Sequence, residues 1–315
     1  MPPLENFDLR PCHPESFFCG MPNHPTLKAL LAVVALVPLA QAAEPLPPIT
    51  ITGKALMPEA LKEESPAGAW GQPEWVQSRR FATTRVHIQR SPGEVALEQW
   101  WRGRLKDGKF SHRFQEEIEF GLPGRIQIDL YQDWTVEENK AEHLDFAAEI
   151  RWAPADWGVI PLNPALYLEY KWTDRDRGGD VIEPKLLLGD ELWPGVHYGL
   201  NFVYERELSG EEAEEWQITQ GISWTVIDET LSLGLEAKYV NETAAESRGD
   251  PEHKCLLGPS IQWRPTHNTH LDLVALAGMT AESPDMEAWL VFGIDFDIGK
   301  GTQQKKVHGP VSGMR

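Results

Sequence analysis

Four pairs of oppositely charged residues stand two positions apart in stretches of alternating polar and apolar sequence. The pairs are Glu149/Arg151, Glu169/Lys171, Glu183/Lys185 and Glu236/Lys238. Residues two positions apart on a strand share one face of a sheet, so these charges would line a common polar surface. Such a surface can form a charge-lined channel for small polar or cationic solutes. It can equally form a ladder of ion pairs that fills a barrel and stiffens it, and the sequence leaves both interpretations open.

The same alternation assigns a larger set of charged residues to this polar face. The lumen-lining candidates are Arg113, Glu117, Glu119, Arg125, Asp129, Glu149, Arg151, Glu169, Lys171, Glu183, Lys185, Glu236, Lys238, Asp272 and Asp295.

Catalytic and metal chemistry have weaker support. Glu117 and Glu119 share a face as an acid/base pair would, but paired glutamates on a wet face are commonly only solvated. A phospholipase-type enzyme needs a serine and a histidine on one rim, whereas the neighbours Ser111 and His112 point to opposite faces of a strand. His267 and His270 lack a third metal ligand. We therefore expect no catalytic residue, no metal site and no cofactor.

The elements that position these residues are strands. Segments of near ten residues, the length of a tilted membrane-spanning strand, alternate apolar and polar residues about twelve times, with an uncertainty of two in that number. The expected strands are 95–104, 110–121, 125–134, 142–152, 164–173, 181–190, 195–206, 214–226, 231–241, 253–264, 268–279 and 286–298. Connections after odd strands are often long and polar, and those after even strands are mostly tight. The pattern predicts an all-β, transmembrane, up-and-down antiparallel barrel.

Aromatic residues recur at or near the ends of the expected strands. The interface candidates are Trp134, Trp152, Trp172, Trp193, Tyr204, Trp216, Trp224, Tyr239 and Trp263. Tryptophan and tyrosine gather at the two surfaces of a bilayer, where one part of the ring is apolar and another is wet. The excess of tryptophan, thirteen in the chain, is thereby interpreted as an aromatic belt around a membrane barrel.

Composition excludes other classes. A net charge of −19 argues against nucleic-acid binding, which needs a basic face. The longest apolar run, residues 29–40, is shorter than the roughly 20 residues of a membrane helix. The acidic balance also predicts that any channel would favour small cations over anions.

The N-terminus has the features of an export signal. Lys28 precedes the apolar run, and Ala40 and Ala42 form a cleavage signal, so residues 1–42 are interpreted as an upstream extension and a Sec signal peptide starting at Met21. Residues 43–93 are a Pro-rich irregular segment that stays in the periplasm, plugs the lumen, or couples to an energy-transducing partner through residues 47–53. Residues 94–299 form the barrel, and residues 300–315 form a basic tail.

Two stretches carry a family resemblance. The sequence from Leu97 to Trp100, with that from Glu117 to Tyr131, resembles bacterial outer-membrane proteins of the phenol-degradation meta-pathway type. Here Pro123-Gly124 replaces the usual Thr-Asp turn, and the likeness fades after residue 134. The resemblance implies an outer-membrane location and passage of small molecules, and it supplies no catalytic residues.

We therefore expect a passive channel or diffusion protein for small polar, cationic or aromatic solutes in the outer membrane of a Gram-negative bacterium. Its expected partners are outer-membrane lipid and lipopolysaccharide, the barrel-insertion machinery and small-molecule solutes. The alternatives are a non-conducting structural barrel, a phospholipase-type enzyme of the outer membrane, and a soluble secreted β-protein.

Overall fold

The computed structural model describes residues 61–137 and 140–297. The cleavage residues Ala40 and Ala42, residues 43–60 and the basic tail lie outside the described residues, and the expectations about them stay predictions. Among the residues described, no helix has the length and apolar character needed to cross a membrane.

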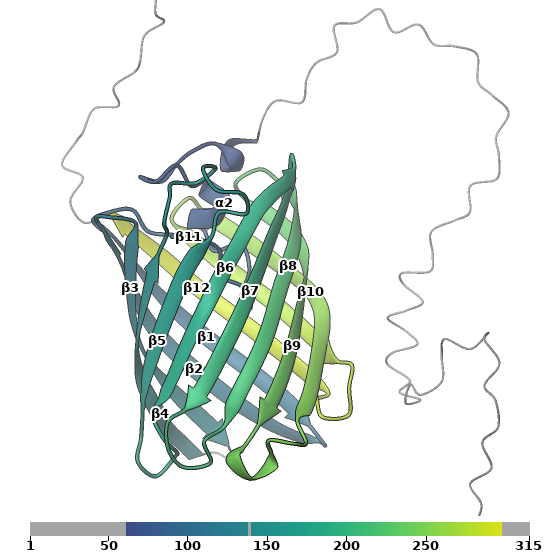
Figure 1. Cartoon of the computed structure of the whole chain (residues 1–315). Helices are drawn as coiled ribbons and strands as arrows, with labels where there is room; N and C mark the ends of the chain where they lie inside the picture. The colour runs from purple at the N-terminus through teal and green to yellow at the C-terminus, as the bar shows by residue number, and fades with distance from the viewer. Residues whose placement is uncertain (1–60, 138–139, 298–315) are drawn as a thin grey trace, which may run out of the picture. The chain divides into compact units, whose positions relative to one another are not determined.

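Twelve antiparallel strands close into a single barrel (Figure 1). Each strand pairs with its neighbours in sequence, and the last strand closes the ring by pairing with the first. The strands are β1 (Glu94–Lys106), β2 (Lys109–Leu122), β3 (Ile126–Glu137), β4 (Lys140–Trp152), β5 (Ala165–Thr173), β6 (Val181–Trp193), β7 (Val196–Glu207), β8 (Glu214–Ile227), β9 (Leu231–Thr243), β10 (Glu252–Thr266), β11 (Thr269–Gly278) and β12 (Met286–Asp297). The predicted up-and-down barrel and its strand number are confirmed.

Connections differ between the two ends of the barrel. The turns after β2, β6, β8 and β10 are tight, as predicted, whereas residues 153–164 make the connection after β4 long. At the other end, the turn after β1 is tight because Asp107 and Gly108 both take positive φ values, 52° and 74°, which suits a two-residue hairpin.

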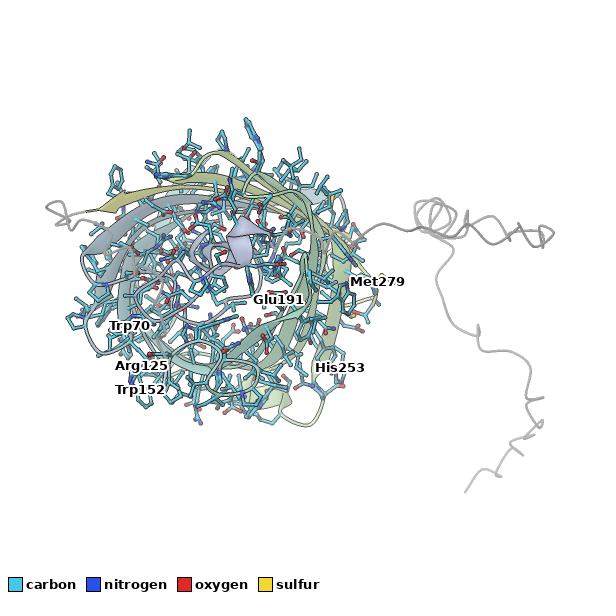
Figure 2. All side chains as sticks on the ribbon, turned by 90° about the horizontal axis from the view of Figure 1, so that it is seen from above. Trp70, Arg125, Trp152, Glu191, His253 and Met279 are labelled. Atoms are coloured by element: carbon cyan, nitrogen blue, oxygen red, sulfur yellow. The ribbon has the colours of Figure 1, made fainter. Side chains whose placement is uncertain are left out.

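The two faces of the barrel differ in chemistry. Leu130, Phe146 and Leu168 are each at least 45% exposed on the outer face, while Asp129 and Glu149 beside them are buried inside. Figure 2 looks along the barrel and shows side chains both filling the interior and radiating outward. A soluble protein buries its apolar face, so this barrel is inverted and suits apolar surroundings outside and polar ones inside.

Strand register brings like charges together inside the barrel. Glu119 pairs with Asp129, Asp129 with Glu149, Glu149 with Glu169, and Glu169 with Glu183. We call these five carboxylates, on β2 to β6, the acidic row. Like charges directly opposite one another destabilise a sheet, so the acidic row requires cations from elsewhere.

Residues 61–93, which we call the inner segment, enter the barrel at the end that carries the β8–β9 and β6–β7 turns (Figure 1). The segment contains a short 3-10 helix, η1 (Lys62–Glu64), and one helical turn, α2 (Glu74–Gln77); another 3-10 turn, η2 (Ala245–Ser247), follows β9. Trp75, Phe81 and Ile88 are each at most 1% exposed. The inner segment therefore places three large apolar side chains in the barrel interior.

Candidate functional site

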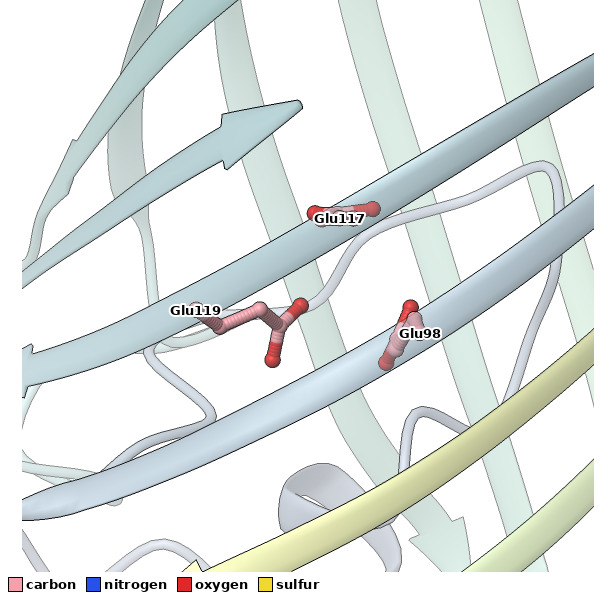
Figure 3. Close-up of side chains that lie close together, drawn as sticks. All are labelled: Glu98, Glu117 and Glu119. Atoms are coloured by element: carbon pink, nitrogen blue, oxygen red, sulfur yellow. The ribbon is translucent and has the colours of Figure 1, made fainter. Parts of the chain in front are cut away.

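Arginines of the inner segment supply cations to a cluster of carboxylates on β1 and β2. Glu98 on β1 lies beside Glu117 and Glu119 on β2, with carboxylate oxygens within 4.8 Å of one another (Figure 3). The Arg79 Nε atom is 2.8 Å from Glu98 Oε1, and its Nη2 atom contacts Glu119. Arg90 Nε is 2.5 Å from Glu119 Oε2. Guanidinium groups thus occupy the place that a metal ion would need.

Arg151 joins the acidic row to the inner segment. Its side chain is fully buried, with Nη2 2.6 Å from Asp129 Oδ2 and Nε in contact with Glu149. The Nη1 atom donates a 2.5 Å hydrogen bond to Gln89 of the inner segment. The planar guanidinium group of an arginine can bind two carboxylates at once, whereas the single ammonium group of a lysine cannot do so with the same geometry.

Three of the four predicted two-apart pairs are ion pairs. Arg151 contacts Glu149, Lys185 contacts Glu183, and Lys171 lies 3.2 Å from Glu169. The fourth pair does not form, because Glu236 instead accepts hydrogen bonds from the backbone N–H groups of Ala82 and Thr83. Among the described residues, Lys238 has no carboxylate within ion-pair distance.

Two inward-facing glycines let the inner segment pack against the wall. A Cβ atom on Gly121 would lie 2.0 Å from Ser91 O, and one on Gly221 would lie 2.5 Å from the Phe81 ring. Any larger residue at either position would displace the inner segment, so the wall and the segment are complementary in shape as well as in charge.

His87 makes the seating of the inner segment sensitive to pH. It lies beside the β4–β5 connection, with its ring edge-on to Trp157 at 5.5 Å. Burial lowers the pKa of His87 from 6.5 to about 4. The folded state therefore prefers the neutral imidazole ring. The contribution of neutral His87 to the stability of the seated inner segment is complete above pH 6.5 and is lost as the pH falls toward 4.

We expect the inner segment to become accessible to protease at pH 4.5 and to be protected at pH 7.5. The change should correspond to about 2–3 kcal/mol, since pH 4.5 lies two units below 6.5 and each unit is worth about 1.4 kcal/mol. A His87→Gln variant should show a smaller pH dependence. Equal cleavage of the wild-type chain at both pH values would contradict the role assigned to His87.

A cavity of about 260 Å³ lies in the lumen beyond the inner segment. Its floor includes Ala82, Thr83 and Arg85, and its walls carry seven basic side chains, Arg85 included, against five acidic ones. The basic residues are Arg85, Arg102, Arg104, Arg113, Lys171, Lys185 and Lys238; the acidic residues are Asp133, Glu169, Glu183, Glu205 and Glu215. The chain as a whole is acidic, but basic residues outnumber acidic ones around this cavity. The composition of the chain therefore did not indicate the charge of the cavity.

Most of the predicted lumen residues face the interior. Nine are buried there: Glu117, Glu119, Asp129, Glu149, Arg151, Glu169, Glu183, Glu236 and Asp272. Arg113, Lys171, Lys185 and Lys238 line the cavity. Asp295 is bound by Arg90 at 2.7 Å. Arg125 differs, because it lies in the β2–β3 turn with φ of 60° and pairs with Asp156 at 2.9 Å.

Sequence reasoning missed several interior residues. Glu98, Arg102, Arg104, Asp133 and Glu287 share the inward parity of their strands and could have been found by applying the alternation to the whole of each expected strand. The role of the inner segment's arginines was also missed. Four arginines within residues 79–90, directly before an acidic barrel, were the available signal.

The interface aromatics lie on the outer side of the barrel. Trp152, Trp172, Trp193, Trp216, Trp224, Tyr239 and Trp263 are exposed. Trp134 and Tyr204 are half-buried; Trp134 packs against His143, and Tyr204 lies 4.6 Å from Trp216. Their assignment to membrane interfaces stays a prediction.

The weaker catalytic and metal candidates are engaged in other contacts. His112 Nδ1 accepts a hydrogen bond from Trp101 on the outer face. His270 is buried with its Nδ1 atom 2.6 Å from Asp272. Glu117 is bound by Arg85 at 3.3 Å.

No protein-family model and no curated protein matches this sequence. Solved structures do match the fold. The COG4313 outer membrane channel from Pseudomonas putida F1 is similar with a TM-score of 0.51 at 8% identity, over 67% of this chain and 98% of that chain. NanC porin has a TM-score of 0.47 at 8% identity, over 64% of this chain and 98% of that one. KdgM porin has a TM-score of 0.42 at 8% identity, over 64% and 99%.

At 8% identity the likeness to the COG4313 channel concerns the fold alone, and it agrees with the barrel described above. The narrower resemblance to the phenol-degradation meta-pathway family is not confirmed by this likeness and stays a prediction.

Proposed function

We propose that this chain is an outer-membrane channel through which small polar solutes diffuse, narrowed by its own inner segment. One observation carries the proposal: a polar cavity lies inside a closed barrel whose outer face is apolar. A hydrocarbon environment satisfies the outer face, and closure leaves no unpaired strand edge in the lipid. The similarity in fold to an outer membrane channel supports the same function.

Location and processing belong to the proposal as well. A Sec signal cleaved after Ala42 would deliver the chain to the periplasm of a Gram-negative bacterium, where the barrel-insertion machinery would place it in the outer membrane among lipopolysaccharide. The tight turns would then face the periplasm, and the inner segment would enter the lumen from that side.

A non-conducting structural barrel is the second candidate. The buried contacts of Arg79, Arg90 and Arg151 favour it, because they bind the inner segment firmly across the lumen.

Fractionation and planar-bilayer recording test these proposals together. We expect the full chain in the outer-membrane fraction, with gel migration that changes on boiling, and small discrete conductance steps in the bilayer. Recovery from the soluble periplasm would refute the membrane assignment. Correct insertion without conductance, in the full chain and in a variant lacking the inner segment, would support the structural alternative.

A further inference from the structure

We propose that the lumen cavity beyond the inner segment binds small organic anions that carry a carboxylate. Arg102, Lys238 and Arg85 would hold the charged group, and two tryptophans would contact the rest of the molecule. The inference rests on the proposed channel function for its physiological meaning, since it names the class of solute that would pass. It reverses the preference for cations that the acidic composition suggests.

In the described part of the chain, the acids nearest to Arg102 and Lys238 form their closest contacts with other groups. Glu287 is bound by Arg104 at 2.5 Å and by the Trp289 indole N–H at 2.9 Å. Glu236 accepts hydrogen bonds from the backbone N–H and the hydroxyl group of Thr83 in the inner segment. Among the described residues, neither Arg102 nor Lys238 has a carboxylate oxygen within 4.0 Å.

Arg85 adds a third donor from the floor of the cavity. Its Nη2 atom is 3.3 Å from Glu117, but its Nη1 atom is buried and has no hydrogen-bond partner among residues 61–137 and 140–297. A buried guanidinium N–H without a partner is costly, and an anion in the cavity can satisfy it.

The acids on the same cavity wall are engaged. Arg113 contacts Asp133, and Lys171 lies within 3.5 Å of Glu169, Glu183 and Glu205. Glu215 accepts a 2.7 Å hydrogen bond from Gln217. Among the described residues, two cavity cations, Arg102 and Lys238, have no carboxylate within 4.0 Å, against one cavity carboxylate, Glu215, that has no cation within that distance. The excess of positive charge attracts anions.

Two tryptophans indicate what the rest of the bound molecule, beyond its carboxylate, would be. Trp100 and Trp289 meet edge to face at 6.0 Å, with Arg85 over the first ring at 5.0 Å and Arg102 over the second at 5.2 Å. Flat apolar surfaces next to cations suit a planar acid better than a fully hydrated ion. The volume of about 260 Å³ accommodates a small acid, and a neighbouring cavity of about 780 Å³ shares Arg104, Glu215 and Lys238 with it.

Calorimetry on the full chain in detergent tests binding without requiring conductance. We expect benzoate to bind, acetate and inorganic phosphate to bind more weakly, and benzylammonium not to bind. Arg102→Gln and Lys238→Gln should each weaken benzoate binding about tenfold, because each removes one charge-assisted contact. The matched control is Arg206→Gln, whose exposed side chain pairs with Glu214 outside the cavity. Heat-modifiable migration checks that each variant is folded.

Bilayer reversal potentials in a salt gradient give the second measurement. An anion preference that both cavity variants lose, and that the control keeps, would support the inference. A conducting channel that prefers cations and binds no benzoate would overturn the inference and leave the channel function standing. Benzoate binding without any conductance would instead refute the channel function and support the binding site.

Discussion

Deleting residues 62–91 should raise single-channel conductance about fivefold or more, because the lumen of a twelve-stranded barrel is wider than its side chains can fill. The hydrogen-bonded ring of strands does not include the inner segment, so the barrel should still close. The deletion removes Arg79, Arg85 and Arg90 from Glu98, Glu117 and Glu119. The truncated channel should therefore select cations, whereas the full chain should not. Bilayer recording with reversal potentials measures both changes.

A charge variant separates the loss of the segment from the loss of its charges. The double variant Arg79→Gln with Arg90→Gln retains the inner segment but removes its strongest ion pairs with the barrel strands. We expect the segment to leave the lumen at times, so that the channel opens frequently to the larger conductance. The matched control, Arg206→Gln with Arg248→Gln, removes the same charge from exposed side chains. A folded deletion variant with unchanged conductance would show that the inner segment does not narrow the pore.

Arg151→Met should destabilise the folded barrel by about 3–5 kcal/mol, because removing one member of a buried ion cluster leaves the other charges uncompensated. Asp129 and Glu149 would lose their shared cation, and Gln89 would lose its contact. The urea midpoint of the refolded protein in lipid vesicles measures the loss. Arg206→Met, at an exposed pair, should change the free energy of unfolding by about 0–1 kcal/mol.

A double variant tests the reason for that loss. Glu149→Gln combined with Arg151→Met removes a buried charge together with its partner, so it should recover part of the lost stability. If Arg151→Met alone unfolds at the wild-type urea concentration, the cluster does not hold the barrel together.

The alternation of residues was sufficient to predict the barrel and the inward residues of its strands. Side chains on a strand point alternately to its two faces, which is a property of the local backbone. Glu117, Asp129, Glu149 and Glu169 therefore had to share a face once the strands were recognised. Applying the same parity to the whole of the first expected strand would have added Arg102 and Arg104.

Only the tertiary structure decided which charges meet. Glu236 and Lys238 have the same spacing as Glu149 and Arg151, yet they do not pair, because Thr83, which is distant in sequence, binds Glu236. Register and closure are non-local, and they aligned the carboxylates of the acidic row across β2 to β6. No local pattern reports such alignments.

The sequence by itself determined a closed barrel with an apolar outside and a charged inside, since strand parity and turn spacing are encoded locally. The fold decided the sign of the unpaired charge that faces a solute in the cavity, because most charged side chains of the lumen are neutralised in ion pairs. The inner segment's arginines neutralise wall carboxylates, while Arg102 and Lys238 remain without carboxylate partners in the described cavity. The net charge counts every charged residue of the chain equally, whereas a solute in the lumen meets mainly the charged side chains that are not already in ion pairs.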